Sequence, residues 1–361
     1  MTETEELFFF TENQDFFEDV KKTINEATKS IYLQTYIFSH DKVGTSIKSL
    51  LKKKALEGLD IRLLIDSWGS SADKVFFRDL VQAGANVRYF KRFREYLSSY
   101  IDYHKRNHRK LLLIDEKIVY LGSTNFEVRN WKESNIKFSH NLSLSKTCRT
   151  LFLRDFENYR GFKNYFSISR RYRKAFLRDS FELFPDVPSF RHTPSLNRLC
   201  KFVASAKKEV YIETPYFLPP RKLSKAFLYA AKKGVSLTIV LPEASDHLLV
   251  DILRRRFLSK LYDKENISLL FYKGKLHSKL MIADKSSLAF GSINLDYRSF
   301  YFQYELLCIL KENYATFVET CYTQAADKLK DCIPVTAEAL KHPNFFHKFL
   351  DKILYRLKSL F

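Results

Sequence analysis

Two stretches of this sequence contain the same succession of segments. The stretch 30–38 reads SIYLQTYIF and the stretch 209–217 reads EVYIETPYF, and each is followed by a helix-like segment, a glycine and an apolar strand. Each copy then reaches a His-x-Lys strand, with His108 and His277 separated by 277 − 108 = 169 residues. An internal repeat of this size predicts two homologous lobes. Strands that alternate with helices indicate that each lobe is of the α/β class with a central sheet.

Composition and prolines indicate where one lobe gives way to the next. A basic, aromatic stretch follows the first copy and ends among Pro185, Pro188 and Pro194, and prolines interrupt regular structure. We therefore place the first lobe at residues 1–165, a linker at 166–195 and the second lobe at 196–361.

One motif, of the form H-x-K-x4-D-x6-G-S-x-N, occurs once in each copy. A lone His-x-Lys is a weak signal, because a histidine on an apolar strand is most often structural. Six matched positions that recur at the same internal spacing favour a functional constellation instead. The matched positions are His108, Lys110, Asp115, Gly122, Ser123 and Asn125 in the first copy, and His277, Lys279, Asp284, Gly291, Ser292 and Asn294 in the second.

The groups that the motif brings together suit a phosphate diester. Residues i and i+2 of a strand face the same side, so each histidine projects with its lysine, and the Gly-Ser-x-Asn turn adds a hydroxyl and an amide. Two lobes folded face to face would place both histidines around one pocket. One imidazole then attacks phosphorus while the other protonates the departing alkoxide, and the lysines and amides stabilise the non-bridging oxygens. We expect neither a metal ion nor a cofactor.

The two motifs resemble the twin HKD motifs of the phospholipase D superfamily and, within it, bacterial cardiolipin synthases. The segments Arg106–Leu112, Thr214–Pro219 and Gly291–Phe300 carry the narrower likeness. The resemblance implies two duplicated α-β-α sandwich lobes that share one active site at their interface. It also implies phosphatidyl transfer through a phosphohistidine, with Glu133 and Glu305 orienting the catalytic histidines.

The candidate site residues fall into two groups besides those two glutamates. Asp115 and Asp284 are expected to organise a turn more than to touch the substrate. The sequence is symmetric between the two histidines, so only the habit of the family makes His108 the nucleophile and His277 the acid. The candidate catalytic residues are His108, Lys110, Asp115, His277, Lys279 and Asp284, and the candidate phosphate-binding residues are Ser123, Asn125, Ser292 and Asn294.

The charge of the chain indicates the kind of partner. Its 61 Lys and Arg residues against 41 Asp and Glu give a formal net charge of +20, which favours a polyanionic partner. We expect an anionic phospholipid substrate at a peripheral membrane surface, and a phosphatidyl group passed from phosphatidylglycerol to a lipid alcohol. Hydrolysis by a phospholipase D is the alternative, and a nuclease acting on nucleic acid is the weaker one. The oligomeric state stays open.

The distribution of charged and apolar residues bears on location. Charged residues interrupt every apolar run, and the sequence begins with acidic residues where a signal peptide would be basic. Five cysteines without a C-x-x-C pair read as reduced thiols. These features predict a cytoplasmic protein, peripheral on the inner face of the cell membrane. Apolar residues at helical spacing, interleaved with basic ones, predict an amphipathic helix over 345–361 that either packs on the second lobe or binds a membrane surface.

Overall fold

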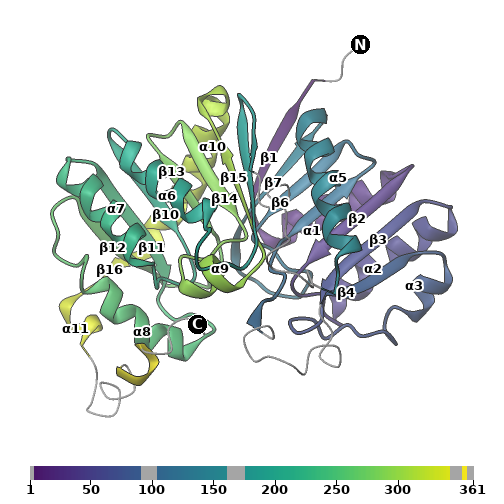
Figure 1. Ribbon diagram of the computed structural model, residues 1–361, viewed down its shortest axis with the longest axis horizontal. Coiled ribbons are helices and arrows are strands. Elements are labelled where there is room, and N and C mark those ends of the chain that lie inside the picture. Colours follow the sequence, from purple (N-terminus) through teal and green to yellow (C-terminus); the bar gives the residue numbers. More distant parts are fainter. Residues whose placement is uncertain (1–3, 91–103, 161–174, 342–351, 356–361) are drawn as a thin grey trace. The chain divides into compact units, whose positions relative to one another are not determined.

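The computed structural model describes residues 4–90, 104–160, 175–341 and 352–355. The chain divides between Lys174 and Ala175 into two compact units, which we call the first and the second lobe. Each lobe is built on its own mixed sheet with helices beside it, so the expected pair of α/β lobes is confirmed (Figure 1).

The first lobe contains a seven-stranded sheet. Its elements are β1 (Glu6–Glu12), α1 (Asn13–Glu26), β2 (Ser30–Thr35), α2 (Lys42–Leu56), β3 (Asp60–Asp66), α3 (Arg78–Gln82), β4 (Asn86–Phe90), β5 (Leu111–Ile114), β6 (Ile118–Gly122), β7 (Lys132–Ser139) and α5 (Leu142–Glu157). The strand order is β1-β7-β6-β5-β2-β3-β4. Strands β2, β3 and β4 run parallel, and the other neighbours are antiparallel.

The second lobe contains a nine-stranded sheet. Its elements are β8 (Phe176–Leu177), β9 (Phe181–Asp186), α6 (Pro194–Ser205), β10 (Glu209–Glu213), α7 (Arg221–Lys232), β11 (Ser236–Pro242), α8 (Leu248–Leu258), β12 (Ile267–Tyr272), β13 (Leu280–Ala283), β14 (Ser287–Gly291), α9 (Tyr297–Phe302), β15 (Glu305–Leu310), a 3-10 helix (Glu312–Tyr314), α10 (Ala315–Ala326), a second 3-10 helix (Asp327–Asp331), β16 (Cys332–Pro334) and α11 (Ala337–Leu340). The strand order is β16-β12-β11-β10-β13-β14-β15-β9-β8.

The central part of the second sheet repeats the first strand for strand. The order β9-β15-β14-β13-β10-β11-β12 matches β1-β7-β6-β5-β2-β3-β4, with the same parallel and antiparallel neighbours. Strand β9 is therefore the counterpart of β1, and the repeat starts inside the stretch predicted to be a linker at 166–195. The predicted boundary was wrong because Pro185 was taken as a break in regular structure. Pro185 instead pairs with Leu306 of β15, and it lies outside the two residues of β9 that pair with β8. A proline is tolerated where that side of a strand has no ladder to join.

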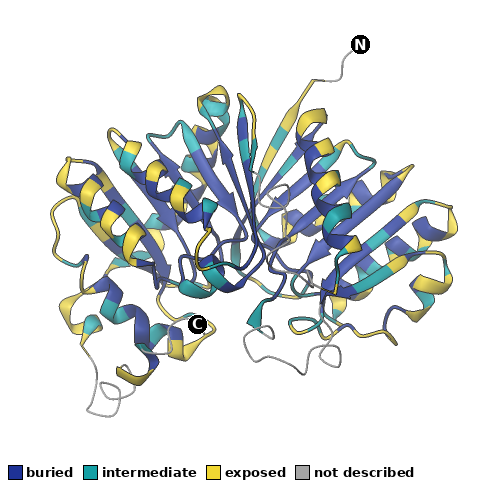
Figure 2. Cartoon of the chain, viewed as in Figure 1, coloured by how far each residue is buried: buried dark blue, intermediate teal, exposed yellow. Residues whose placement is uncertain are grey.

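Each sheet is covered by helices on both faces. Ile31 and Leu33 of β2 face the hydrophobic core formed with α1 and α2, whereas Tyr32 faces the other side and stacks on Phe152 of α5 at 5.1 Å. This alternation is the two-residue period of a strand. In the second lobe Tyr211 of β10 likewise faces α10, where its hydroxyl donates to the carbonyl of Ala325 at 3.1 Å. The buried strands between half-exposed helices are visible in Figure 2.

Only 352–355 of the predicted terminal helix lies within the described residues, and these four residues are helical. Leu354 is buried in the core of the second lobe, and the ring of Tyr355 lies 6.2 Å from that of Phe257 in α8. This part of the helix therefore packs on the second lobe. In the described part of the chain, no helix is both long and apolar enough to cross a membrane.

Candidate active site

In each lobe the motif residues gather at one edge of the sheet. Strands β2, β3 and β4 are parallel, and β5 is antiparallel to β2. The carboxyl ends of β2, β3 and β4 therefore lie at the same edge of the sheet as the start of β5. His108 and Lys110 come directly before β5, Ser123 and Asn125 follow β6, and Glu133 is at the start of β7. The second lobe places the same set around the start of β13. We call this side of each sheet the histidine edge.

The histidine–lysine pair has the same geometry in both lobes. The exposed fractions are 6% for His108, 5% for Lys110, 7% for His277 and 3% for Lys279. The Nζ atom of each lysine donates to the carbonyl of its own histidine, at 2.7 Å in the first lobe and 2.8 Å in the second. Two ammonium groups are thus held with little water around them, where they act most strongly on a nearby negative charge.

Each serine of the motif is bonded to a carboxylate at the start of a strand. The hydroxyl of Ser123 donates to Glu133 Oε2 at 2.5 Å, and that of Ser292 donates to Glu305 Oε2. The backbone N–H that follows each glutamate donates back to the serine, at 2.8 and 2.9 Å. A serine has one hydroxyl proton, so in this arrangement neither serine offers it to a substrate phosphate, the role predicted for both.

The two asparagines differ in how their side chains are engaged. Asn125 accepts from the N–H of Ile37 at 3.3 Å and donates to Glu127 at 3.4 Å. Asn294 is 4% exposed, and its Oδ1 is buried without a hydrogen-bond partner in the described structure. This oxygen is an acceptor, so only an N–H or O–H donor could supply the missing contact.

Asp115 and Asp284 hold the turns at the far end of the motif strands. Asp115 accepts from the backbone N–H of Thr28, Lys29 and Ser30 at 2.7–2.9 Å, and Asp284 accepts from the three residues 207–209 at 2.7–3.1 Å. Both aspartates adopt positive φ, 53° and 51°. The four-residue strand β5 or β13 separates each from its lysine, a span of roughly 13 Å.

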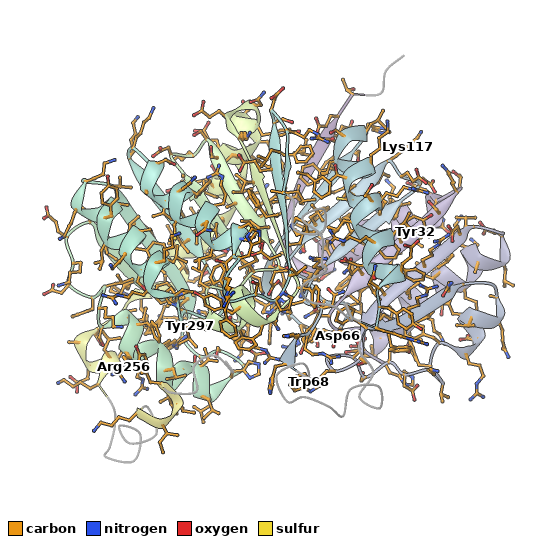
Figure 3. All side chains as sticks on the ribbon, in the orientation of Figure 1. Tyr32, Asp66, Trp68, Lys117, Arg256 and Tyr297 are labelled. Atoms are coloured by element: carbon orange, nitrogen blue, oxygen red, sulfur yellow. The ribbon has the colours of Figure 1, made fainter. Side chains whose placement is uncertain are left out.

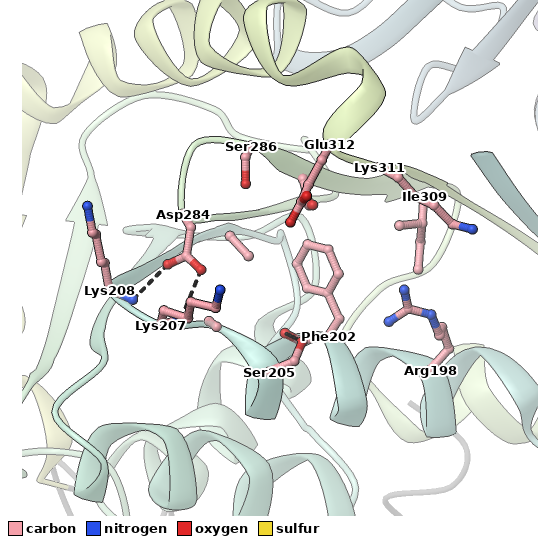
Figure 4. A pocket seen from close by; sticks show the side chains of 13 residues that line it. Arg198, Phe202, Ser205, Lys207, Lys208, Asp284, Ser286, Ile309, Lys311 and Glu312 are labelled. Atoms are coloured by element: carbon pink, nitrogen blue, oxygen red, sulfur yellow. Dashed lines mark hydrogen bonds between the residues drawn. The ribbon is translucent and has the colours of Figure 1, made fainter. Parts of the chain in front are cut away.

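The cavity beside the Asp284 turn belongs to this far edge as well. It has a volume of about 290 Å³, and Figure 4 shows Lys207, Arg198 and Glu312 around it. Arg198 is already paired with Glu182 at 2.5 Å. Because β13 lies between this cavity and His277, we do not include the cavity in the candidate site.

The turn aspartates predict a pH dependence of stability. Burial opposes ionisation of Asp115, but the hydrogen bonds from Ser30, Thr28 and Lys29 outweigh it and lower the pKa of this carboxyl. A lowered folded-state pKa contributes stability above the unfolded value of about 4, and this contribution is lost as pH falls through the folded pKa. Asp115→Asn is expected to lower the free energy of unfolding at pH 7 by about 1–3 kcal/mol.

Urea denaturation at several pH values checks this expectation. The difference between Asp115→Asn and the unmodified chain should shrink as pH falls below about 4, because the carboxyl is then protonated first in the unfolded chain and, at the lowered folded-state pKa, in the folded protein as well. A difference that stays constant down to pH 2.5 would contradict the assigned role.

A buried ion pair fixes the segment that leads to His108. The guanidinium of Arg106 donates to Asp66 Oδ1 from Nε at 3.0 Å and from Nη2 at 2.8 Å, and the N–H of Asn107 donates to Asp66 Oδ2 at 2.8 Å. Asp66 is fully buried at the end of β3. Figure 3 shows Asp66 at one end of the first lobe and Lys117, next to the Asp115 turn, at the other. Asp66 thus positions the backbone immediately before the histidine.

Breaking this pair is expected to be costly. Asp66→Asn leaves the charge of Arg106 buried without compensation, so the free energy of unfolding should fall by about 3–5 kcal/mol in urea denaturation. The control is Asp327→Asn, which breaks an exposed pair with Lys330 and should change stability by less than about 1 kcal/mol. Equal effects of the two substitutions would show that Asp66 has no special structural role.

Two further residues at the first histidine edge were not predicted from the sequence. The ring of Tyr36 meets that of His108 edge-on at 5.0 Å, and Lys110 Nζ lies 5.6 Å from the same tyrosine ring. Arg109, inside the motif, is buried and paired with Asp155 of α5. Burial opposes ionisation of Asp155, but Arg109 and Arg154 outweigh it and lower the pKa of its carboxyl.

The second lobe also contains a buried ion pair, but different residues form it. Its counterpart of Arg109 is Ser278, and a buried pair of Lys328 with Glu213 at 2.6 Å lies on the α10 side of the sheet. Its counterpart of Tyr36 is Pro215, so the aromatic ring that contacts His108 has no equivalent at that position of the second lobe. The two halves are therefore duplicated but not interchangeable.

Comparison with known proteins agrees with this description. A two-lobed α/β chain with a buried His–Lys pair in each lobe defines an enzyme of the phospholipase D class. The family model described as cardiolipin synthase, PLD-like domain, matches residues 20–155 and 199–328, and the chain belongs to this family. It is accordingly an enzyme of the phosphatidyltransferase type.

Individual relatives extend the likeness to most of the chain. A cardiolipin synthase of Clostridium perfringens (strain SM101 / Type A) is 29% identical over 99% of this chain and 78% of its own length. One from Listeria welshimeri is 27% identical over 86% of this chain and 67% of its own. Among solved structures, a phosphatidylserine synthase of Haemophilus influenzae superposes with a TM-score of 0.76 at 13% identity, covering 98% of this chain and 95% of that one. This last match concerns the fold.

Proposed function

We propose that this chain transfers a phosphatidyl group from phosphatidylglycerol to a lipid alcohol, most simply a second phosphatidylglycerol, through a phosphohistidine. The observation that carries the proposal is the duplicated, buried His–Lys pair backed by a Ser–Glu bond in each lobe. The proposal assigns a separate chemical role to the histidine of each lobe. Relatives named cardiolipin synthase support the choice of donor and acceptor.

In the first half of the proposed reaction, His108 attacks phosphorus and the bond from phosphorus to the glycerol oxygen breaks. His277 gives its proton to that departing oxygen. In the second half, the acceptor alcohol attacks phosphorus, His277 takes the alcohol proton, and the bond between phosphorus and nitrogen breaks. Both histidines thus end in their starting states.

The remaining site residues act on charge and position in this proposal. Lys110 and Lys279 stabilise the non-bridging oxygens of the phosphorane-like transition state, and the side-chain N–H groups of Asn125 and Asn294 donate to the same oxygens. Glu133 and Glu305, at the start of β7 and β15, orient the catalytic histidines in this proposal. Asp115 and Asp284 act from a distance, because they hold the turns that fix β5 and β13.

The proposed location is the inner face of the cell membrane, with the protein bound peripherally from the cytoplasm. The net charge of +20 supports this location, since basic residues near an anionic leaflet each contribute about 1 kcal/mol of attraction.

Incubation of the purified protein with vesicles of labelled phosphatidylglycerol tests the function. Cardiolipin and glycerol are the expected products in equal amounts. Phosphatidic acid without cardiolipin would replace the proposal by a hydrolytic phospholipase D. Cleavage of DNA without lipid turnover would replace it by a nuclease.

A further inference from the structure

We propose that the second lobe inserts the side chains of Phe190, Leu248 and Leu249 into the interface of an anionic phospholipid bilayer. We call these three residues the apolar tip. The inference rests on the proposed function, because it assumes that the substrate is drawn from a membrane. It assigns membrane contact to a surface of the second lobe other than the predicted terminal helix.

The apolar tip comes from two separate places at the histidine edge of the second lobe, because four strands lie between β9 and β11 in the sheet. Strand β9 ends at Asp186 beside the start of β15, and β11 ends beside the carboxyl end of β10, where β13 begins. Phe190 lies in the loop after β9, and Leu248 and Leu249 start α8 after the loop that follows β11. In Figure 1, α8 and α9 lie at the same end of this lobe. The tip is therefore on the side of the sheet from which His277 and Lys279 project.

The three side chains are exposed although they are large and apolar. Their exposed fractions are 66% for Phe190, 71% for Leu248 and 38% for Leu249. The ring of Phe190 packs on two rings of α9: it stacks on Tyr301 at 5.5 Å and contacts Phe302 edge-on at 5.0 Å. The neighbouring Val250 of α8 is buried, which fixes the first turn of this helix with both leucines outward. Apolar groups held outward beside a lipid site gain by entering the boundary between head groups and acyl chains.

The charge around the apolar tip complements an anionic lipid surface. Exposed basic residues at the histidine edge of this lobe are Arg191, Arg221, Lys273 and Lys275. The exposed acids in the same loops are Glu243 and Asp246, and Asp246 already accepts from the hydroxyl of Tyr216 at 2.6 Å. Basic residues near a membrane attract the negative leaflet within about one Debye length. Apolar tip and basic rim together fit an anionic bilayer better than a neutral one.

Vesicle binding of matched variants tests the tip. The double substitution Leu248→Glu/Leu249→Glu, and separately Phe190→Glu, should weaken co-sedimentation with phosphatidylglycerol vesicles by at least about tenfold. The control is Leu177→Glu: Leu177 is 58% exposed but lies in β8, paired with Glu182 near the opposite edge. It should bind vesicles within about twofold of the unmodified chain. Tip variants that bind as well as Leu177→Glu would overturn the proposal.

The basic rim gives a second arm. Lys273→Glu/Lys275→Glu should weaken binding to phosphatidylglycerol vesicles and flatten its salt dependence, while leaving the weak binding to phosphatidylcholine vesicles unchanged. Equal losses on both lipids would contradict the assigned charge complementarity. Tip variants that lose concentration-dependent self-association, with vesicle binding intact, would make the tip an interface between copies of this chain.

Turnover of a dispersed substrate separates this inference from the proposed function. With short-chain phosphatidylglycerol below its critical micelle concentration, the tip variants should keep the turnover of the unmodified chain within about twofold, and only their turnover on vesicles should fall. If no lipid is turned over but the tip variants lose vesicle binding, the proposed function is wrong and the proposed membrane contact of the apolar tip is supported. If lipid is turned over and the tip variants bind vesicles normally, only the proposed membrane contact is wrong.

Discussion

Replacing either histidine of the duplicated motif is expected to abolish nearly all turnover. Loss of a general acid–base group costs roughly 10²–10⁴-fold in rate, and loss of the nucleophile costs more. His108→Asn and His277→Asn keep a polar group in each buried position, so the effect reports on chemistry more than on packing. The measurement is release of glycerol from phosphatidylglycerol at saturating substrate.

A matched control exists in the first lobe. His140 follows β7 at the edge opposite His108 and has a positive φ of 63°, a conformation that asparagine tolerates well. His140→Asn should turn over substrate within about twofold of the unmodified chain. If His108→Asn or His277→Asn keeps half of the activity, the lobes act as independent sites and the shared mechanism is refuted.

Removing the ammonium groups is expected to give the next largest effect. Lys110→Met and Lys279→Met each delete a buried positive charge that we place on the phosphate oxygens, and a preorganised group of this kind is worth roughly 10²–10³ in kcat. The loss should appear mainly in kcat, since the stabilisation is greatest in the transition state.

Each lysine also donates to a backbone carbonyl, so stability must be measured alongside turnover. Lys117→Met, in the exposed turn at the far end of the first lobe, should alter neither quantity (Figure 3). Loss of kcat in parallel with loss of folded protein would assign the two lysines a purely structural role.

Much of the fold follows from the repeat itself. The two similar stretches of sequence fold into the same order of strands, from β2 to β7 in the first lobe and from β10 to β15 in the second. The apolar runs at 111–114 and 280–283 form fully buried central strands. The boundary of the second lobe was misplaced because Pro185 read as a break. The N–H that Pro185 lacks destabilises a strand only where a neighbouring strand would accept a hydrogen bond from it. Where β8 and β15 pair with β9 decides this, and the local sequence does not contain that information.

The residues of the candidate site could likewise be predicted only in part from the sequence. The histidines, lysines and serines could be named from their spacing, and the resemblance to the phospholipase D superfamily added the two glutamates. Their spacing differs between the lobes: Glu133 lies 133 − 123 = 10 residues after its serine, and Glu305 lies 305 − 292 = 13 residues after its own. Helix α9 accounts for the longer connection in the second lobe. Asp66 and Tyr36 could not be found this way. Asp66 is the last residue of β3 and Tyr36 directly follows β2, and only the sheet brings these strand ends to the segment that contains His108.

The most direct test of the account is to trap the covalent intermediate. A phosphatidyl ester with a p-nitrophenolate leaving group needs no proton from His277, so His277→Asn should release one equivalent of p-nitrophenolate and then stop. Mass spectrometry of the digested protein should then find the phosphatidyl group on the peptide that contains His108, and on no peptide of His108→Asn. Continued turnover with neither histidine labelled would contradict the account.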